Sequence, residues 1–286
     1  MRNITLFICM FMFSGLVVSC KSVLKEKLPV ENSSTYDLNN PLAIKLPIEL
    51  DEISGIVYSP MDTAIFAVTD EDGVLYKIGL ANKSIIQSWR FDKKRDYEEL
   101  MFQDGIFYVL VSNGDIESIR VSDGNAIELE KSEFPDTGNS KNEFEAMYYD
   151  DGLEMLILLC KDCDGKKSIA AWGYSIYDRD YVPFPFELDL DSVAQKLGID
   201  KINLKPSGAA VNPVTNEVYI LASINKLIII TDRSGKFIDL IELDPAIYEQ
   251  PEGITFDNQG NLYISNEKGR GNHATILQFL LKSKVR

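Results

Sequence analysis

Short apolar runs separated by polar turns dominate the chain from residue 42 onward. The runs are rich in β-branched and aromatic residues, and Asp-Gly, Asn-Gly and Ser-Gly steps separate them. Both properties are typical of antiparallel strands joined by tight turns. The pattern therefore predicts one all-β domain over residues 42–286.

One phrase recurs five times and sets the period of the chain. The copies are EISGIVY from Glu52, DYEELMF from Asp96, EFEAMYY from Glu143, KPSGAAV from Lys205 and QPEGITF from Gln250. Successive copies start 44, 47, 62 and 45 residues apart, and further apolar runs follow each one. Four strands in about 45 residues is the size of one propeller blade. Because an ordinary sandwich of hairpins has no reason to keep one register for five rounds, we predict a five-bladed β-propeller of four-stranded antiparallel blades.

The fifth repeat ends the chain one strand short, and residues 42–50 offer the missing strand. Their sequence, LAIKLPIEL, alternates like a strand and belongs to no complete repeat. We predict that it pairs with residues 274–282, closes the last blade and so removes an exposed sheet edge. The longest interval between repeats contains an insertion, where an N-cap at Asp191 or Ser192 and a later Gly198 predict one short surface helix.

The N-terminus has a different pattern from the rest of the chain. Residues 1–19 have an early arginine and then an apolar run, which is typical of a secretory signal peptide and too short for a comfortable membrane span. The ending VVSC resembles a bacterial lipobox, so we expect cleavage before Cys20 and attachment of lipid, including palmitate, at this residue. An ordinary signal peptide with an incidental cysteine is the alternative. Residues 20–41 are polar and predict a flexible tether that holds a lipoprotein to the lipid bilayer of the bacterial cell envelope.

The chain is strongly acidic, with 29 basic and 44 acidic side chains and a formal net charge of −15. Such a surface repels nucleic acid and anionic lipid headgroups, whereas it is compatible with cations. Good solubility alone also accounts for much of this charge. We therefore expect no nucleic-acid partner, and instead a small ligand or an envelope protein.

Two cysteines, Cys160 and Cys163, lie in the segment LLCKDCDGKK. An oxidising compartment allows this pair to close as a disulfide, with two free thiols as the alternative. A zinc site would need a second pair of ligands, and His273 is the only histidine of the chain. The pair follows a predicted strand rather than opening a helix, which disfavours a thioredoxin-like redox site.

The first strand of each propeller blade lines the central channel, so the recurring phrase brings one residue of every blade to the same height. Alignment on Gly253 places at this ring position Ser54, Glu98, Glu145, Ser207 and Glu252. We expect the rim of the channel to be lined by Ser54, Ser207, Glu52, Asp96 and Glu99. The turns between second and third strands open on the same face, which adds Asp70, Glu71, Asn113, Asp115, Asn225 and Glu267.

Glutamates at one rim suit a hard cation, because calcium takes about six to eight oxygens from carboxylates, carbonyls and waters. We predict Glu98, Glu145 and Glu252 as ligands of a calcium-like ion. Without a cation, three like charges at one rim should raise at least one pKa. Alternatively, a glutamate at this position accepts hydrogen bonds from backbone N–H groups at the channel mouth. The sequence leaves both roles open, and it offers both Glu98 and Glu99 for one place.

The chain resembles the SdiA-regulated, YjiK-like β-propeller family in its lipoprotein form, over residues 42–280. The resemblance rests on LDEISGIVY, VTDEDGVLYKI, KRDYEEL, NEFEAM, LKPSGAAV and QPEGITFD, in this order and spacing. It implies a channelled propeller at the cell envelope with no settled activity. Gluconolactonase-like hydrolases, strictosidine synthase relatives and esterase-like phytases share the PEGI type of phrase, and some hold calcium in the channel through such a glutamate. By that match Glu252 is the best candidate ligand.

Two functions from different classes follow. The first is an envelope-anchored binding or scaffold module with a cation at its channel mouth. The alternative is a metal-dependent hydrolase of a lactone or phosphate ester that works through the same glutamates. A Ser-His-Asp or Cys-His hydrolase is disfavoured, because the chain has one histidine and no G-x-S-x-G motif. The sequence assigns no catalytic residue.

Overall fold

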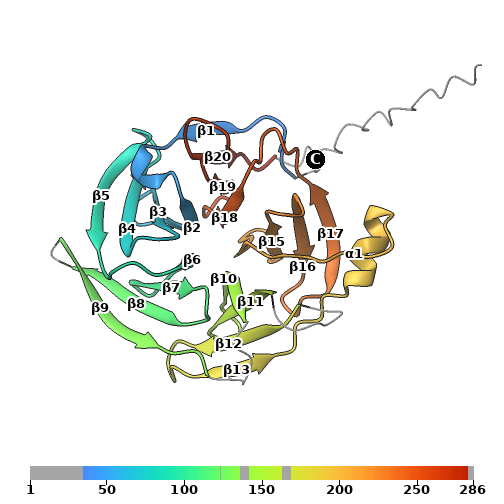
Figure 1. The fold of residues 1–286 in the computed structure, drawn as a ribbon, viewed down its shortest axis with the longest axis horizontal. Coiled ribbons are helices and arrows are strands. Elements are labelled where there is room, and N and C mark those ends of the chain that lie inside the picture. Colours follow the sequence, from blue (N-terminus) through green and yellow to red (C-terminus); the bar gives the residue numbers. More distant parts are fainter. Residues whose placement is uncertain (1–34, 123, 136–141, 163–168, 283–286) are drawn as a thin grey trace, which may run out of the picture.

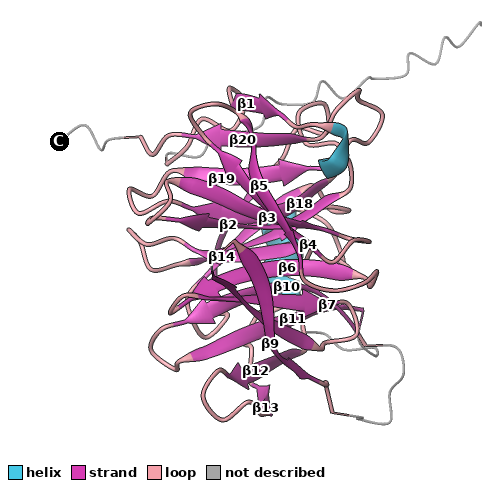
Figure 2. Ribbon diagram, turned by 90° about the vertical axis from the view of Figure 1, so that its left-hand side faces the viewer, coloured by secondary structure: helices cyan, strands magenta, loops and turns pink. Residues whose placement is uncertain are grey.

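The structure of the protein is a computed structural model, and it describes residues 35–122, 124–135, 142–162 and 169–282. In these residues five four-stranded antiparallel sheets surround a central axis, as Figure 1 shows along the axis and Figure 2 from the side. The predicted five-bladed, all-β propeller is therefore confirmed.

The strands of blades 1 to 4 follow one another outward from the axis in chain order, and in blade 5 the outermost strand comes from the N-terminal end of the domain. Blade 1 contains β2 (Ile53–Ser59), β3 (Ala64–Thr69), β4 (Val74–Gly79) and β5 (Ser84–Arg90). Blade 2 contains β6 (Tyr97–Gln103), β7 (Ile106–Val111), β8 (Ile116–Ser122) and β9 (Asn125–Ser132). Blade 3 contains β10 (Glu143–Asp150), β11 (Met155–Asp162), β12 (Ala171–Ser175) and β13 (Tyr181–Phe184). Blade 4 contains β14 (Gly208–Val211), β15 (Val218–Ala222), β16 (Leu227–Thr231) and β17 (Phe237–Glu242). Blade 5 contains β18 (Pro251–Phe256), β19 (Leu262–Asn266), β20 (Thr275–Phe279) and β1 (Leu42–Lys45).

Strand β1 closes the ring as predicted, by pairing antiparallel with β20 at the outer edge of blade 5. The predicted strand over residues 42–50 is too long, however. Pro47 has no N–H to give to a partner strand, and Ile48–Leu50 form a 3-10 turn instead. One blade thus joins the two ends of the domain, and the propeller has no free edge at the closure.

Residues 35–41 belong to the folded domain and not to the predicted tether. Tyr36 and Leu38 are fully buried between blades 4 and 5. The Tyr36 hydroxyl donates to the carbonyl of Gly260 at 2.7 Å, and the Leu38 carbonyl accepts from the Tyr248 hydroxyl at 2.8 Å.

The predicted signal peptide and the lipidation site Cys20 lie outside the described residues, so both stay predictions. In the part of the chain that the structure describes, no helix is both long and apolar enough to cross a membrane.

Helix α1 (Leu190–Leu197) follows blade 3 and precedes blade 4 in the chain, as the insertion predicts, and it lies at the outer edge of blade 4 beside β17. Its N-cap is Asp189 rather than Asp191 or Ser192. The Asp189 carboxylate accepts the Asp191 N–H at 3.1 Å and the Ser192 hydroxyl at 2.7 Å, so the helix starts earlier than expected. Gly198 ends the helix with a φ of 68°, a conformation that glycine adopts without steric cost.

The hydrophobic core lies between the blades. Five apolar clusters each join one pair of neighbouring blades. Between blades 1 and 2, for example, the Phe66 and Phe107 rings are 4.7 Å apart, and the Trp89 indole stacks on Phe66. Because burial of these side chains holds the blades together, the residues at the central channel are free to be polar.

Candidate functional site

The first strands of the blades (β2, β6, β10, β14 and β18) lie side by side around the channel, and glycines allow this close approach. A Cβ added to Gly55 would lie 2.5 Å from the Glu99 Cα, and one added to Gly253 would lie 2.5 Å from the Ser54 carbonyl oxygen. Gly208 meets the backbone of blade 5 at the same 2.5 Å. These contacts are too short for any other residue unless the backbone moves.

The rim serines join neighbouring blades. The Ser54 hydroxyl donates to the Glu98 carbonyl at 2.7 Å, and the Ser207 hydroxyl donates to the Pro251 carbonyl at 3.1 Å. Ser265 on β19 donates to the Ser54 carbonyl at 3.0 Å. Both ring serines therefore bind backbone at the channel mouth, by donating to a carbonyl group of the neighbouring blade.

Glu99 occupies the interior of the channel, deeper than the rim position predicted for it, and is only 1% exposed. Its two carboxyl oxygens accept the N–H of Leu100 at 3.0 Å and that of Ala209, in blade 4, at 3.2 Å. The Met147 N–H of blade 3 also bonds to this carboxyl. Burial raises the pKa of Glu99 well above its usual range. One side chain thus links three blades through the channel, which is the backbone-bonding role foreseen for one of the two adjacent glutamates.

The three ring glutamates, Glu98, Glu145 and Glu252, all approach the channel mouth. Burial and the charge of Glu145 raise the pKa of Glu98 to about 9. Burial and neighbouring carboxylates raise the pKa of Glu252 to about 8, although the Ser223 hydroxyl donates to one of its oxygens at 3.1 Å. Burial also raises the pKa of Glu145, which is 7% exposed. The rise in pKa that was expected for carboxylates gathered at one rim is therefore present in all three glutamates.

Lys161 on β11 supplies a positive charge inside this acidic mouth. Its Nζ donates to the Glu145 carboxylate and lies 3.9 Å from a Glu143 carboxyl oxygen. Its charge also lowers the pKa of Glu98, although burial outweighs this effect. One of the three predicted metal ligands is therefore already paired with a side-chain cation. The role of the ring glutamates as ligands stays a prediction.

Lys161 directly follows Cys160, which is disulfide-bonded. Cys163, the bonding partner that the sequence suggests, lies outside the described residues, so this pairing also stays a prediction.

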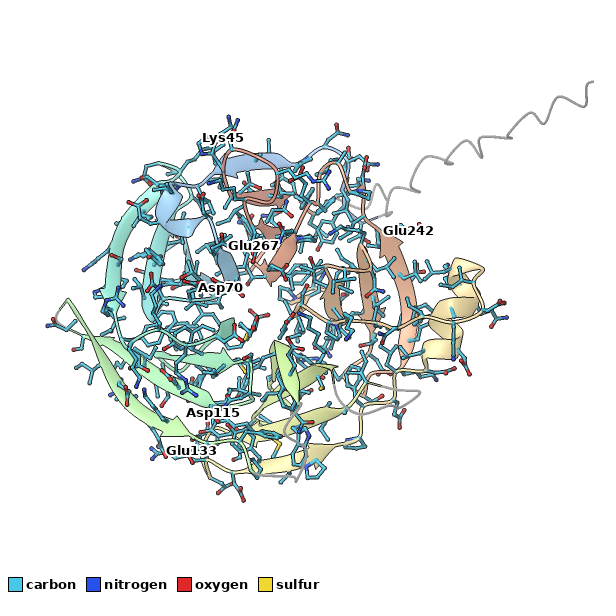
Figure 3. All side chains as sticks on the ribbon, viewed as in Figure 1. Lys45, Asp70, Asp115, Glu133, Glu242 and Glu267 are labelled. Carbon is cyan, nitrogen blue, oxygen red and sulfur yellow. The ribbon has the colours of Figure 1, made fainter. Side chains whose placement is uncertain are left out.

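A second group of carboxylates converges at the same mouth. We call it the mouth triad: Glu52 before β2, Asp70 after β3 and Glu267 after β19. Each contributes a carboxyl oxygen, and these oxygens all lie within 4.8 Å of one another. Asp70 Oδ1 is buried and has no hydrogen-bond partner among the described residues. Figure 3 shows Asp70 and Glu267 at the inner ends of their blades, near the axis.

Burial and charge repulsion both act on the mouth triad. Burial, reinforced by neighbouring carboxylates that include Glu52, raises the pKa of Glu267 to about 7 and that of Asp70 to about 6. The sequence had placed all three residues on this face but had not singled them out as ligands. The available signal was that Asp70 and Glu267 occupy equivalent turns of blades 1 and 5, which are neighbours only after the ring closes.

Other residues expected on this face divide between the mouth and the loops. Asp96 faces the mouth, because its charge contributes to the raised pKa of Asp70. Asp115 instead pairs with Arg95 at 2.5 Å within blade 2, and the Asn225 side chain accepts a backbone N–H at 3.0 Å in blade 4. The face is therefore less uniformly acidic than the sequence suggested, and its free carboxylates concentrate near the axis.

The arrangement can hold a hard cation. Closely spaced carboxylates supply the oxygen ligands that calcium prefers, and the unpartnered Asp70 oxygen would gain a partner. A bound cation would lower the raised pKa values of Asp70 and Glu267 and so favour their ionised forms.

A family model described as SdiA-regulated matches residues 36–270. The chain belongs to the SdiA-regulated family. The resemblance inferred from the repeated phrases is thereby confirmed for this SdiA-regulated propeller. No curated protein matches it.

Solved structures share the fold of this SdiA-regulated protein at low sequence identity. Glutaminyl cyclase of Myxococcus xanthus has a TM-score of 0.60 and 12% identity, over 84% of this chain and 94% of the cyclase. A luciferin-regenerating enzyme has a TM-score of 0.51 and 11% identity, over 85% and 97% of the two chains. Regucalcin of Agrobacterium tumefaciens, described as a calcium-binding protein, has a TM-score of 0.51 and 10% identity, over 82% and 91%. At these identities the likeness concerns the fold alone.

Proposed function

We propose that this protein is an envelope-anchored binding propeller whose channel mouth holds a hard divalent cation such as calcium. The observation that carries the proposal is the mouth triad, in which Glu52, Asp70 and Glu267 bring carboxyl oxygens within 4.8 Å of one another. Three carboxylates this close repel one another in a partly buried mouth, and a cation at their centre would replace repulsion by attraction.

The mouth triad supplies only part of a calcium shell of about six to eight oxygens, and waters or further carboxylates complete it. Glu98 and Glu252 are protonated at neutral pH without a cation, because their pKa values are raised to about 9 and about 8, and a bound cation would favour their ionised forms. Lys161 opposes binding on the side of Glu145, which it contacts, so the ion is expected on the triad side. The fold shared with regucalcin, described as calcium-binding, is compatible with this assignment.

Calcium titration of the full chain, with the melting temperature as readout, tests the cation site. Calcium at about one hundred times its dissociation constant should stabilise the fold by about 2.7 kcal/mol, or about 5–10 °C. Glu267→Gln and Asp70→Asn should abolish this shift. Glu242→Gln, an exposed substitution on the outer strand β17, is the matched control. A calcium shift of equal size in all these variants would refute the mouth triad as the site.

A second candidate function is metal-dependent hydrolysis of a lactone or phosphate ester. It is favoured by Glu98, because a carboxyl with a pKa of about 9 is protonated at neutral pH, as a general acid requires. A screen with generic lactones and phosphate esters in the presence of calcium separates the two functions. Turnover that Glu98→Gln abolishes supports the hydrolase, whereas stabilisation by calcium without turnover supports the binding module.

Envelope anchoring is part of the proposal, and the leader with its VVSC ending supports it. Cys20→Ser should move the protein from the membrane fraction to the soluble fraction of bacterial cells. Retention of the variant in the membrane fraction would contradict anchoring through Cys20.

A further inference from the structure

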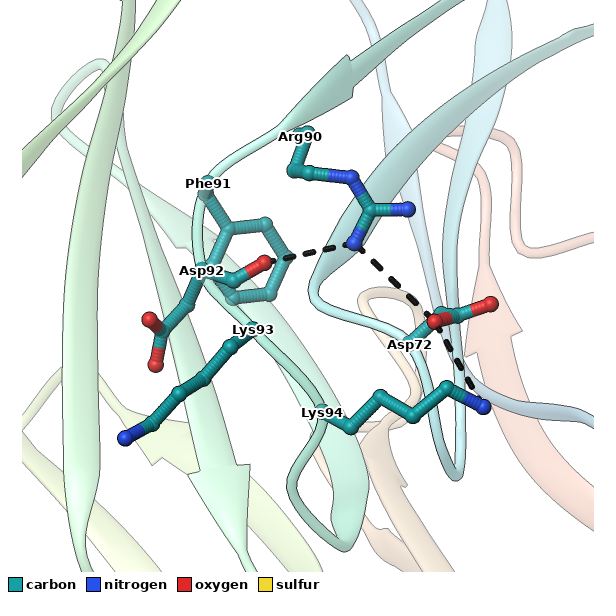
Figure 4. A pocket seen from close by; sticks show the side chains of 6 residues that line it. All are labelled: Asp72, Arg90, Phe91, Asp92, Lys93 and Lys94. Carbon is teal, nitrogen blue, oxygen red and sulfur yellow. Dashed lines mark hydrogen bonds and ion pairs between the residues drawn. The ribbon is translucent and has the colours of Figure 1, made fainter.

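A cleft with exposed cations lies beside the acidic mouth. It has a volume of about 560 Å³ and is lined by Asp72, Arg90, Phe91, Asp92, Lys93 and Lys94, as Figure 4 shows. It forms where the turn between β3 and β4 meets the connector from blade 1 to blade 2. Its three cations are a local reversal of sign on a chain with a net charge of −15.

The cations of the cleft are not fully neutralised by its carboxylates. Asp92 is engaged from outside the cleft by Lys131, whose Nζ lies 2.6 Å from its carboxylate. Lys93 is exposed and makes no ion pair with any residue that the structure describes. A positive charge therefore remains for a ligand.

The other two cations make only weak or exposed ion pairs. Arg90 Nη1 and Lys94 Nζ lie 3.9 and 4.0 Å from one Asp72 oxygen, and Lys94 also lies 3.0 Å from Glu71. Arg90 and Lys94 are 61% and 69% exposed. Exposed pairs of this kind contribute about 0–1 kcal/mol, so an incoming anion can displace them at little cost.

The walls of the cleft are held in place. The carbonyl of Gly73 accepts the N–H of Phe91 at 2.9 Å and that of Asp92 at 3.3 Å. A Cβ at Gly73 would lie 2.6 Å from the Asp92 carbonyl oxygen, so this close approach requires glycine. The Phe91 ring packs edge-on against Tyr97 with centroids 5.2 Å apart. A cleft formed in advance loses little conformational entropy when it binds.

The cleft and the mouth triad share one turn. Asp70 belongs to the triad and Asp72 lines the cleft, so their Cα atoms are at most about 7 Å apart. The Asp70 carbonyl accepts the Tyr97 N–H at 2.8 Å, and the Asp70 N–H donates to the Glu52 carbonyl at 3.2 Å. Backbone hydrogen bonds therefore hold the cleft in a constant position relative to the triad.

We propose that this cleft binds the phosphate group of an anionic ligand through Arg90, Lys93 and Lys94. A guanidinium donates two parallel hydrogen bonds to phosphate oxygens, and the two ammonium groups add point charges. Because the cleft and the mouth triad share one turn, the proposal extends to a cation held between the bound phosphate and the triad. That second contact rests on the proposed function, whereas the contact with the three cations does not.

Calorimetric titration of the full chain with glycerol 3-phosphate, in a chelator and at low salt, tests the cleft separately from the cation site. The variant R90Q/K93Q/K94Q should bind at least about tenfold more weakly than the wild type. The control K45Q/K201Q/K236Q removes the same charge at exposed lysines of blades 4 and 5 and of the connector before β14, and it should bind like the wild type. Equal affinity of the two triple variants, or no binding to the wild type in any arm, overturns the proposal.

Two further arms identify the ligand source and the link to the cation. Binding of vesicles made of phosphatidylcholine and phosphatidylglycerol, lost in R90Q/K93Q/K94Q, without binding of free glycerol 3-phosphate, would assign the phosphate to a lipid headgroup. Calcium should tighten glycerol 3-phosphate binding to the wild type but not to Glu267→Gln. If calcium has no effect while the cleft variant still fails to bind, the anion contact stands and the shared cation is refuted. The melting temperatures of all variants and the single variant Lys93→Gln check that lost binding is not lost folding.

Discussion

Glu98→Gln should stabilise the cation-free protein at neutral pH. Burial, with Glu145 and Asp96, raises the pKa of Glu98 to about 9, whereas an unperturbed glutamate ionises near 4.5. Between these two values the folded state keeps a proton that the unfolded state has released. The free energy of unfolding therefore falls as the pH rises through this window, and it is highest below the unfolded pKa. Glutamine does not titrate, so the free energy of unfolding of the variant does not fall with pH for this reason.

The magnitude follows from proton linkage. For one proton, each pH unit inside the window lowers the free energy of unfolding by about 1.4 kcal/mol. A change from about pH 5 to about pH 7.5 therefore lowers it by at most about 3.4 kcal/mol. The carboxylates around Glu98 titrate together with it, which reduces the expected gain of Glu98→Gln to about 2 kcal/mol at the higher pH. In this chain that gain corresponds to a rise of about 4–8 °C in melting temperature.

Urea unfolding at both pH values, followed by tryptophan fluorescence in the presence of a chelator, measures this effect. The stability difference between Glu98→Gln and the wild type should grow with pH, whereas exposed Glu242→Gln should show no such growth. Saturating calcium should shrink the difference, because a cation favours the ionised form of Glu98. A difference that is independent of pH, or a variant less stable than the wild type at the higher pH, would refute the reasoning.

Three further substitutions and one deletion test the channel and its closure. Glu99→Ala leaves three backbone N–H groups of the channel without an acceptor and should lower the free energy of unfolding by about 3–5 kcal/mol in urea titrations. An unchanged free energy of unfolding would contradict the bridging role of Glu99. Gly253→Ala forces a Cβ against the backbone of blade 1 and should lower the free energy of unfolding by about 1–3 kcal/mol in the same titrations. A melting temperature equal to that of the wild type would show that the two strands can move apart to make room. Lys161→Met removes the partner of a buried carboxylate and should lower the free energy of unfolding by about 1.5–3 kcal/mol without calcium. Calcium should restore more stability to this variant than it adds to the wild type, and an equal gain in both would show that the charge of Lys161 does not oppose calcium binding. Deletion of residues 35–46 opens blade 5 and should produce aggregation in light-scattering measurements, whereas a monodisperse product would show that the closing strand is dispensable.

The repeated phrase made the fold readable, because blade number, strand order and ring position all follow from one period and one register. Errors occurred where local chemistry interrupts that register. Pro47 ended the closing strand early, and Asp189 capped helix α1 before the residues expected to do so. Tyr36 and Leu38 lie in a segment whose sequence predicts a tether, because two apolar residues in a polar segment give no periodic signal. Their partners lie in blades 4 and 5, far along the chain.

The sequence by itself determined that serines and glutamates of five equivalent strands meet at one channel, since register and period act locally and repeat. Only the tertiary structure decided how these carboxylates divide their roles. Glu99 bonds to backbone N–H groups of three blades, Glu145 pairs with Lys161, and Glu52 meets Glu267 because the ring closes between blades 1 and 5. Each of these outcomes depends on distances between residues from different blades, and those distances exist only once the ring is closed.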